Sequence, residues 1–113
     1  MKYKVVLVPF PFDDLSNAKV RPAVCLTEPI GEHKHVVLAF ITSRAPDNPL
    51  STDLILTEKD KDFSVTGLRV SSTLQLHRMM TVTANVIVRD LGTLPVSAQK
   101  NVEGKLKLLF GIK

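Results

Sequence analysis

The longest apolar run of the chain reads HVVLAFIT, residues 35–42, and the rest of the fold has to be built around it. Its interior contains only aliphatic and aromatic residues, several of them β-branched, which is typical of a buried strand. A run of this length is far too short to span a bilayer. We therefore expect residues 35–42 to form the central strand of a sheet.

Shorter apolar segments surround this run on both sides, and each is bounded by residues that favour turns. In the segment 22–27, which precedes this run, two-residue alternation places Ala23 and Cys25 on one face and Val24 and Leu26 on the other. Proline, asparagine and aspartate mark loops at 9–17 and 44–49. The predicted strands are residues 5–8, 22–27, 35–42, 53–57, 68–72, 74–82 and 87–94.

Helical spacing is found only near the end of the chain. Val102, Leu106 and Leu109 recur at the period of a helix, Ser97 is a suitable N-cap and Gly111 a suitable end. The sequence predicts a mainly β fold, in which roughly six or seven short strands make a curled antiparallel sheet or partly open barrel followed by one α-helix. At 113 residues, we expect a single domain over residues 1–113.

Composition limits the class of protein without deciding it. The formal net charge is +4, which suits an anionic partner such as RNA and equally suits an ordinary soluble protein. The single cysteine, Cys25, cannot form an internal disulfide. The apolar run at 5–8 is too short for the core of a signal peptide. We expect a soluble cytoplasmic protein that does not associate with membranes.

Two short polar stretches at strand ends are the candidates for chemistry. Pro22 restricts the backbone of Arg21 to extended geometry, so its guanidinium leaves the sheet in a fixed direction and can hold a phosphate. Thr42 and Ser43 supply adjacent hydroxyls where the central strand ends. Each stretch also has a simpler interpretation, since Arg21 can be a solvated charge and the hydroxyls can cap the following turn.

The remaining polar residues give weaker signals. Gln75 and His77 share one face of a predicted strand, although a mid-strand histidine is more often bonded to a backbone carbonyl. His33 and His35 lack the further ligands that a metal ion needs, and Cys25 fits a small core residue better than a nucleophile. The sequence has no glycine-rich phosphate loop. We therefore expect neither a metal ion nor another cofactor.

Five stretches of the chain together resemble one known family. They are VVLVPFPFDDLS at 5–16, KVRPAV at 19–24, FITS at 40–43, LQLHRMMTV at 74–82 and VRDLGTL at 88–94. In this order they are similar to the MazF/PemK toxin endoribonucleases of type II toxin–antitoxin systems. The resemblance implies an SH3-like barrel with a C-terminal helix, a homodimer, metal-independent cleavage of single-stranded RNA, and inhibition by a cognate antitoxin.

The resemblance also suggests roles for particular residues. The family's catalytic arginine and threonine correspond to Arg21 and Thr42, and a neighbouring hydroxyl corresponds to Ser43. Gln75 and His77 fall where some members place groups that contact RNA or assist catalysis. Phosphate contacts are expected from further basic residues, namely Lys19, Arg44 and Arg78. Tyr3 and Lys4 depart from the family, whose members commonly carry Gly-Asp or Gly-Glu before the first strand.

Two alternatives remain open at the level of sequence. Toxins with the same barrel bind DNA gyrase without cutting RNA, although the tail Phe110-Gly111-Ile112-Lys113 lacks the aromatic ending expected of such a binder. The chain could instead be a degenerate family member that binds an antitoxin or RNA without catalysis, given the departures at Tyr3, Lys4, Gln75 and His77.

Overall fold

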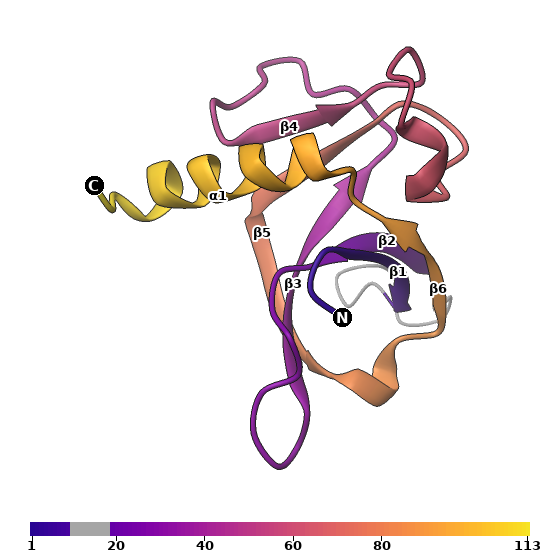
Figure 1. The fold of residues 1–113 in the computed structure, drawn as a ribbon, viewed down its shortest axis with the longest axis vertical. Coiled ribbons are helices and arrows are strands. Elements are labelled where there is room, and N and C mark those ends of the chain that lie inside the picture. The colour runs from indigo at the N-terminus through magenta and orange to yellow at the C-terminus, as the bar shows by residue number, and fades with distance from the viewer. Residues whose placement is uncertain (10–18) are drawn as a thin grey trace.

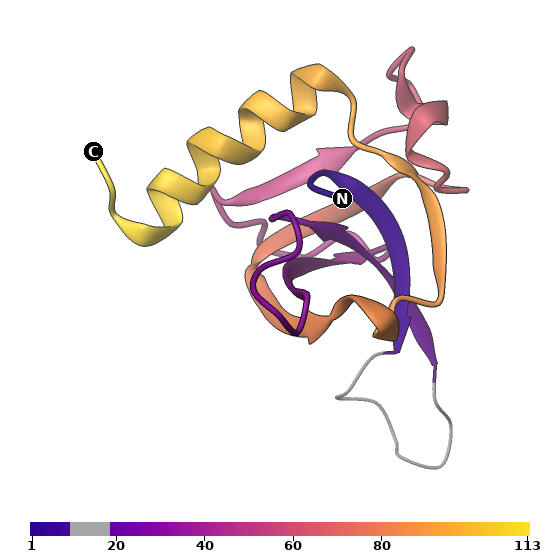
Figure 2. The same ribbon diagram turned by 60° about the horizontal axis from the view of Figure 1, so that its bottom comes forward.

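The fold is a strongly curled antiparallel sheet with one helix laid across it. The computed structural model describes residues 1–9 and 19–113, and within them six strands follow the order β4-β5-β3-β2-β1-β6. Figures 1 and 2 show α1, Val96–Phe110, crossing one side of the curled sheet with its C-terminal end projecting beyond it. The strands are β1 Lys4–Pro9, β2 Val20–Cys25, β3 His35–Thr42, β4 Asp53–Leu56, β5 Ser72–Thr83 and β6 Arg89–Thr93.

This architecture confirms the predicted fold class. All neighbouring strands pair antiparallel, and β4 and β6 are the two edges of the sheet within the described residues, so the barrel is only partly closed. The predicted loop at 9–17 lies outside the described residues, apart from Pro9, which ends β1. The predicted central strand 35–42 agrees with β3 at both ends.

Both faces of β3 are buried, which explains its unbroken apolar sequence. Val36, Leu38 and Phe40 pack on one face with Ala23 and Cys25 from β2. The alternate residues Ala39 and Ile41 pack on the other face, in the core that α1 covers with Ala98 and Val102. A strand with apolar neighbours on both sides cannot alternate polar and apolar residues.

The predicted strand at 68–72 is wrong. A 3₁₀ turn, η1 (Phe63–Thr66), comes first, and Gly67 then adopts a left-handed conformation with φ of 73°. Side chains bond this segment locally, since the Leu68 amide donates to Thr66 Oγ1 (3.1 Å) and Ser72 Oγ donates to the Val70 carbonyl (2.8 Å). Hydroxyl groups therefore take the place of a strand partner, and β5 begins only at Ser72.

Two predicted boundaries also differ from the structure. The helix begins at Val96 with Pro95 in the cap position, so Ser97 is not the N-cap, and no side chain caps the first turn. Proline is suited to this place because it has no amide hydrogen to leave unbonded and its φ is already helical. The last predicted strand, 87–94, is shortened to Arg89–Thr93 because a second 3₁₀ turn, η2 (Ala84–Val86), precedes it.

A bulge in β5 interrupts its pairing with β3. Ala39 pairs with Met79, whereas the next residue, Phe40, pairs with Gln75. The intervening residues 76–78 of β5 therefore have no partner of their own on β3. Bulges of this kind bend a strand and redirect its side chains, and they are common beside functional sites.

Tyr3 has an unusual backbone conformation directly before β1. Its φ of 70° lies in the left-handed region, which favours glycine. Four hydrogen bonds hold the residue there. Its amide donates to the Cys25 carbonyl (2.7 Å), its carbonyl accepts from the Leu94 amide (2.9 Å) and from Thr93 Oγ1 (3.3 Å), and its hydroxyl donates to Glu103 Oε2 (3.0 Å). Burial and this bond to Glu103 raise the pKa of the Tyr3 hydroxyl.

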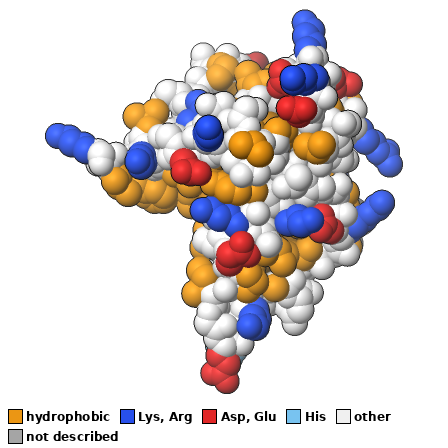
Figure 3. All heavy atoms as spheres, in the orientation of Figure 1, with side chains coloured by type: hydrophobic (Ala, Val, Ile, Leu, Met, Phe, Trp, Pro, Cys, Tyr) orange, Lys and Arg blue, Asp and Glu red, His pale blue; other side chains and the backbone are white. Residues whose placement is uncertain are grey.

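The C-terminal part of α1 and the residues that follow it expose apolar side chains. Leu108, Phe110 and Ile112 are each more than half exposed. In Figure 3, hydrophobic surface runs along the underside of the projecting helix. None of the helices in the described ranges is long and apolar enough to cross a membrane.

Replacing Gly92 with alanine should destabilise the fold by about 2 kcal/mol or more, as expected for overpacking in a tight site. A Cβ at Gly92 would lie 2.2 Å from the Val65 carbonyl oxygen and 2.7 Å from the Thr66 carbonyl carbon, and backbone atoms cannot move aside cheaply. Urea unfolding would measure the change in free energy.

Gly104→Ala is the matched control for this prediction. Gly104 lies within α1 with open space around the added methyl group, so alanine should be neutral or stabilise by up to about 1 kcal/mol. Equal stability of the Gly92→Ala variant and the unchanged protein would show that β6 does not pack against η1 as closely as described.

Candidate functional site

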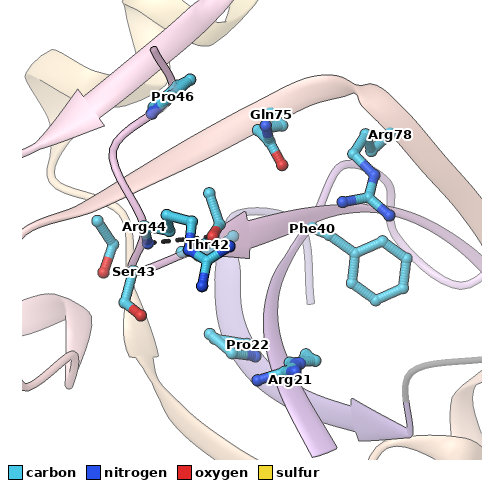
Figure 4. A pocket seen from close by; sticks show the side chains of 11 residues that line it. Arg21, Pro22, Phe40, Thr42, Ser43, Arg44, Pro46, Gln75 and Arg78 are labelled. Carbon is cyan, nitrogen blue, oxygen red and sulfur yellow. Dashed lines mark hydrogen bonds between the residues drawn. The ribbon is translucent and has the colours of Figure 1, made fainter. Parts of the chain in front are cut away.

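The sheet register brings the two predicted polar stretches together. Ala23 of β2 pairs with Phe40 of β3, and continuing this antiparallel register by two residues on each strand leads to Arg21 and Thr42. Both side chains line the same pocket, as Figure 4 shows. Residues that stand 21 positions apart by number therefore meet because β2 and β3 are neighbours in the sheet.

The pocket is open, polar and rich in positive charge. Its volume is about 570 Å³, and its lining contains guanidinium groups from β2, from the segment after β3 and from β5. No carboxylate is among the described lining residues. The guanidinium groups of this lining favour a bound anion. The lining residues are Arg21, Pro22, Phe40, Ile41, Thr42, Ser43, Arg44, Pro46, Ser72, Gln75 and Arg78.

The Thr42 hydroxyl has a defined hydrogen-bonding role. Its Oγ1 accepts the backbone N–H of Arg44 at 3.1 Å, which holds the turn that follows β3. The turn-capping interpretation of this hydroxyl is therefore correct. It does not compete with a functional role, because a hydroxyl that accepts one bond still has its own hydrogen to donate. The turn fixes the oxygen, and the hydrogen can be directed at a ligand.

Arg21 lies within β2, whereas the sequence placed it directly before the strand. The strand begins at Val20, two residues earlier than predicted, and Arg21 pairs with Val8 of β1. Pro22 follows in the strand and is itself half-buried in the pocket wall. The guanidinium is thus carried by a rigid strand, while Arg21 as a residue remains exposed to solvent.

The bulge in β5 sends two of its polar residues into the pocket. Gln75 lies opposite Phe40 at the start of the bulge, and Arg78 lies at its end. Alternation alone would place these two residues on opposite faces of a regular strand, because they are separated by an odd number of positions. The bulge removes this restriction and allows both side chains to line one site.

Two of the predicted site residues do not line the pocket. Lys19 is exposed just before β2, and His77 lies at the middle of the bulge, beside the pocket. His77 Nδ1 is 3.9 Å from Asp53 Oδ1 on β4, so the histidine contacts a carboxylate rather than a backbone carbonyl. The structure therefore brings together Arg21, Thr42, Ser43, Arg44, Gln75 and Arg78, and leaves Lys19 and His77 outside the lining.

Several residues near the site carried no recognisable signal in the sequence. Phe40 is an apolar core residue by pattern, yet its buried ring also forms part of the pocket wall. Pro46 belongs to a loop whose path the sequence does not specify. Asp53 was expected only as the first residue of a strand, and its pattern gave no sign that it would be buried.

Cys25 takes no part in this site. It is fully buried in the core, and burial raises the pKa of its thiol to about 11. A thiol with so high a pKa is protonated at neutral pH and unreactive, as expected for a core residue. Across residues 1–9 and 19–113, no group of three or more His, Cys, Asp and Glu side chains is placed to hold a metal ion.

Comparison with known protein families gives one match over nearly the whole chain. Residues 1–110 match the family described as PemK-like, MazF-like toxin of type II toxin–antitoxin system. No curated protein sequence is similar enough to the chain to count as a match.

Solved structures with the same fold include toxins and toxin complexes. The Mycobacterium tuberculosis toxin MazF-mt6 is 19% identical, with a TM-score of 0.75 over 97% of this chain and 98% of that chain. A mycobacterial endoribonuclease in complex with its cognate antitoxin is 11% identical, with a TM-score of 0.72 over 100% and 96%. MazE-MazF from Deinococcus radiodurans is 18% identical, with a TM-score of 0.69 over 99% and 95%. At these identities the likeness shows the fold alone.

Proposed function

This chain belongs to the PemK-like, MazF-like toxin family of type II toxin–antitoxin systems, and we propose that it is an endoribonuclease that cuts single-stranded RNA without a metal ion. The observation that carries the proposal is the pocket in which Arg21 and Thr42 meet. Guanidinium groups are well suited to binding phosphate, because their planar fork matches two phosphate oxygens. The basic net charge of the chain is in keeping with such a substrate.

In the proposed reaction the RNA supplies its own nucleophile. The ribose 2′-hydroxyl attacks the adjacent phosphorus, and the bond from phosphorus to the 5′-oxygen of the next nucleotide breaks. One proton leaves the 2′-oxygen and one is added to the departing 5′-oxygen, which gives a 2′,3′-cyclic phosphate and a 5′-hydroxyl end. The protein then has to stabilise the extra negative charge that develops on the phosphoryl oxygens.

Arg21 and Thr42 are placed to supply that stabilisation. A guanidinium remains protonated at all physiological pH values, so Arg21 suits the role of binding the non-bridging oxygens better than that of proton acceptor. Thr42 can donate its hydroxyl hydrogen to the same oxygens, since its oxygen is already fixed by the Arg44 amide. Donors that are held in place before the reaction begins need no reorganisation as charge develops.

Replacing Arg21 or Thr42 with alanine should lower the rate of RNA cleavage in EDTA by at least about 100-fold, the loss expected when one donor to a developing oxyanion is removed. Thr42→Ser should retain much of the activity because serine keeps both the accepting oxygen and the donated hydrogen. The measurement is single-turnover cleavage of a single-stranded RNA, with mapping of the fragment ends.

Arg69→Ala is the matched control for the arginine variant. Arg69 is exposed and outside the pocket lining, so the rate should stay as it is in the unchanged protein. An RNA with 2′-deoxy substitutions should bind without being cut, because it lacks the nucleophile. Cleavage that persists in Arg21→Ala, or that needs a divalent metal, would refute the proposed mechanism.

RNA binding should weaken as salt concentration rises, and Arg44 and Arg78 should each contribute to that dependence. For single strands, log K decreases with log salt, and the magnitude of this slope becomes smaller by about 0.7 for each phosphate contact that is lost. Arg44→Ala and Arg78→Ala should each reduce the slope by about this amount in a binding titration with the 2′-deoxy RNA. The slope for Arg69→Ala should remain that of the unchanged protein, and equal slopes in all variants would exclude phosphate contacts at the pocket.

We further propose two protein partners, a cognate antitoxin and a second copy of this chain. One of the structurally similar proteins is an endoribonuclease solved with its cognate antitoxin, and this supports the first partner. The exposed apolar residues of α1 support the second, because apolar surface of this kind is often covered by another chain.

Phe110→Glu should shift a dimer towards the monomer, since it places a charge within the apolar part of α1 that we expect to be covered. Sedimentation velocity at several protein concentrations would measure the change. Lys113→Gln lowers the net charge by the same one unit at the end of the chain and should have little effect. A protein that sediments as a monomer before any substitution would contradict the proposed dimer.

A further inference from the structure

One buried carboxylate near the pocket has an oxygen without a hydrogen-bond donor. The Asp53 side chain is only 3% exposed, and its Oδ2 accepts the Leu50 amide at 2.9 Å. Its Oδ1 is fully buried and is the one side-chain nitrogen or oxygen atom of the described residues that is buried without such a bond. A buried acceptor without a donor is costly, so this atom needs a structural or functional explanation.

The imidazole of His77 lies close to Asp53 Oδ1. The 3.9 Å between Asp53 Oδ1 and His77 Nδ1 is too long for a hydrogen bond, so a bond between them requires the ring to move closer to the carboxylate. His77 lies in the bulge of β5, where its backbone is free of the regular pairing with β3. The His77 side chain is 37% exposed, so one edge of the ring faces the carboxylate while the ring remains accessible to a ligand.

The turn that carries Asp53 is held firmly from several sides. The Asp53 amide donates to the Leu50 carbonyl (3.0 Å), and Lys105 Nζ of α1 donates to the Ser51 carbonyl (2.7 Å). The neighbouring charged group on β5 is Arg78, which points into the pocket. The carboxylate is therefore the fixed partner, and the imidazole is the one that adjusts.

This pair lies next to the pocket rather than inside it. Asp53 of β4 is directly opposite Gln75 of β5, and Gln75 in turn is opposite Phe40 of β3. Gln75 and Phe40 both line the pocket, so the row across the sheet leads from the pocket to Asp53. A strand of RNA whose scissile phosphate occupies the pocket would pass His77 with a flanking nucleotide.

We propose that Asp53 is a positioning residue that accepts the Nδ1–H of His77 and thereby makes His77 Nε2 a hydrogen-bond acceptor that selects the base flanking the cleaved phosphate. The inference rests on the proposed ribonuclease function. A neutral imidazole has one donor and one acceptor nitrogen, and the partner of one nitrogen decides the role of the other. Bases differ in where they present N–H donors, so an acceptor of fixed direction distinguishes among them.

The first test is the tautomer of His77 in the free protein. Long-range ¹H–¹⁵N correlation spectra at a pH where the ring is neutral should show the hydrogen on Nδ1. In Asp53→Asn the amide oxygen can still accept the Leu50 amide, and the NH₂ group then faces His77, so the hydrogen should move to Nε2. A wild-type ring that carries its hydrogen on Nε2 would overturn the proposal.

The second test is the choice of cleavage sites in a pool of random RNA. His77→Ala should lose the base preference at one position beside the cut, by about threefold to tenfold in relative rate, the value of one hydrogen bond. Asp53→Asn should change the preferred base at that same position, because Nε2 becomes a donor. His33→Ala, at the exposed tip between β2 and β3, is the matched histidine control and should keep the wild-type preference.

The possible outcomes separate this inference from the function on which it rests. If the wild-type protein cuts RNA and Asp53→Asn cuts the same sites with the same relative rates, the specificity role is wrong and the ribonuclease assignment stands. If the wild-type protein cuts no RNA, the proposed function fails and the specificity role fails with it. Should Asp53→Asn not fold, the wild-type tautomer and the site preference of His77→Ala still decide the question.

Discussion

The pairing of β3 with β5, and the bulge that interrupts it, is the constraint on which the site depends. β3 is apolar on both faces and must be covered on both, which fixes its place in the middle of the sheet. Its register with β2, continued beyond the last paired residues, then brings Arg21 and Thr42 to the same pocket. On the other side of β3, the adjacent residues Ala39 and Phe40 pair with Met79 and Gln75 of β5. The residues of β5 between these two partners are therefore outside the regular ladder. Arg78 of the site comes from this piece, and Gln75 pairs with Phe40 directly before it.

The side chains that need a precise position are carried by rigid elements of the fold, whereas the others lie at the exposed rim of the pocket. This arrangement fits the proposed chemistry. Thr42 is fixed by a bond to the backbone of its own turn, and Arg21 projects from a paired strand. Arg44 and Arg78 are exposed residues at the rim, where a long side chain can follow a flexible RNA backbone at little cost. The site thus combines a small pre-organised centre with an adaptable basic border, which suits both the transition-state stabilisation and the binding of an unstructured strand that we propose.

The sequence predicted what local patterns encode and missed what depends on side chains meeting in space. The strand 35–42 was predicted with its correct ends because continuous apolar character is a local property. Arg21 and Thr42 were chosen as strand-end residues, and the sheet register placed them together. The strand at 68–72 was wrong because hydroxyl side chains bond that segment locally, and the bulge went unrecognised because it depends on pairing between distant strands. The burial of Asp53 follows from the same long-range pairing, so no window of sequence around it could reveal it.

Tyr3 shows how a non-glycine residue in a left-handed conformation can be accommodated by its own contacts. A non-glycine residue in a left-handed conformation costs about 1–2 kcal/mol. Glycine at this position would avoid that cost but would have no side chain, whereas Tyr3 packs against the core beneath α1 and donates its hydroxyl to Glu103 of that helix. A hydrogen bond of this kind makes a net contribution of about 1 kcal/mol to stability, and burial of part of an aromatic ring contributes a similar amount or more. The strain is therefore offset locally, and the start of β1 is tied to α1. Since Val8 of β1 in turn pairs with Arg21 of β2, the strand that carries the proposed catalytic arginine is anchored through β1.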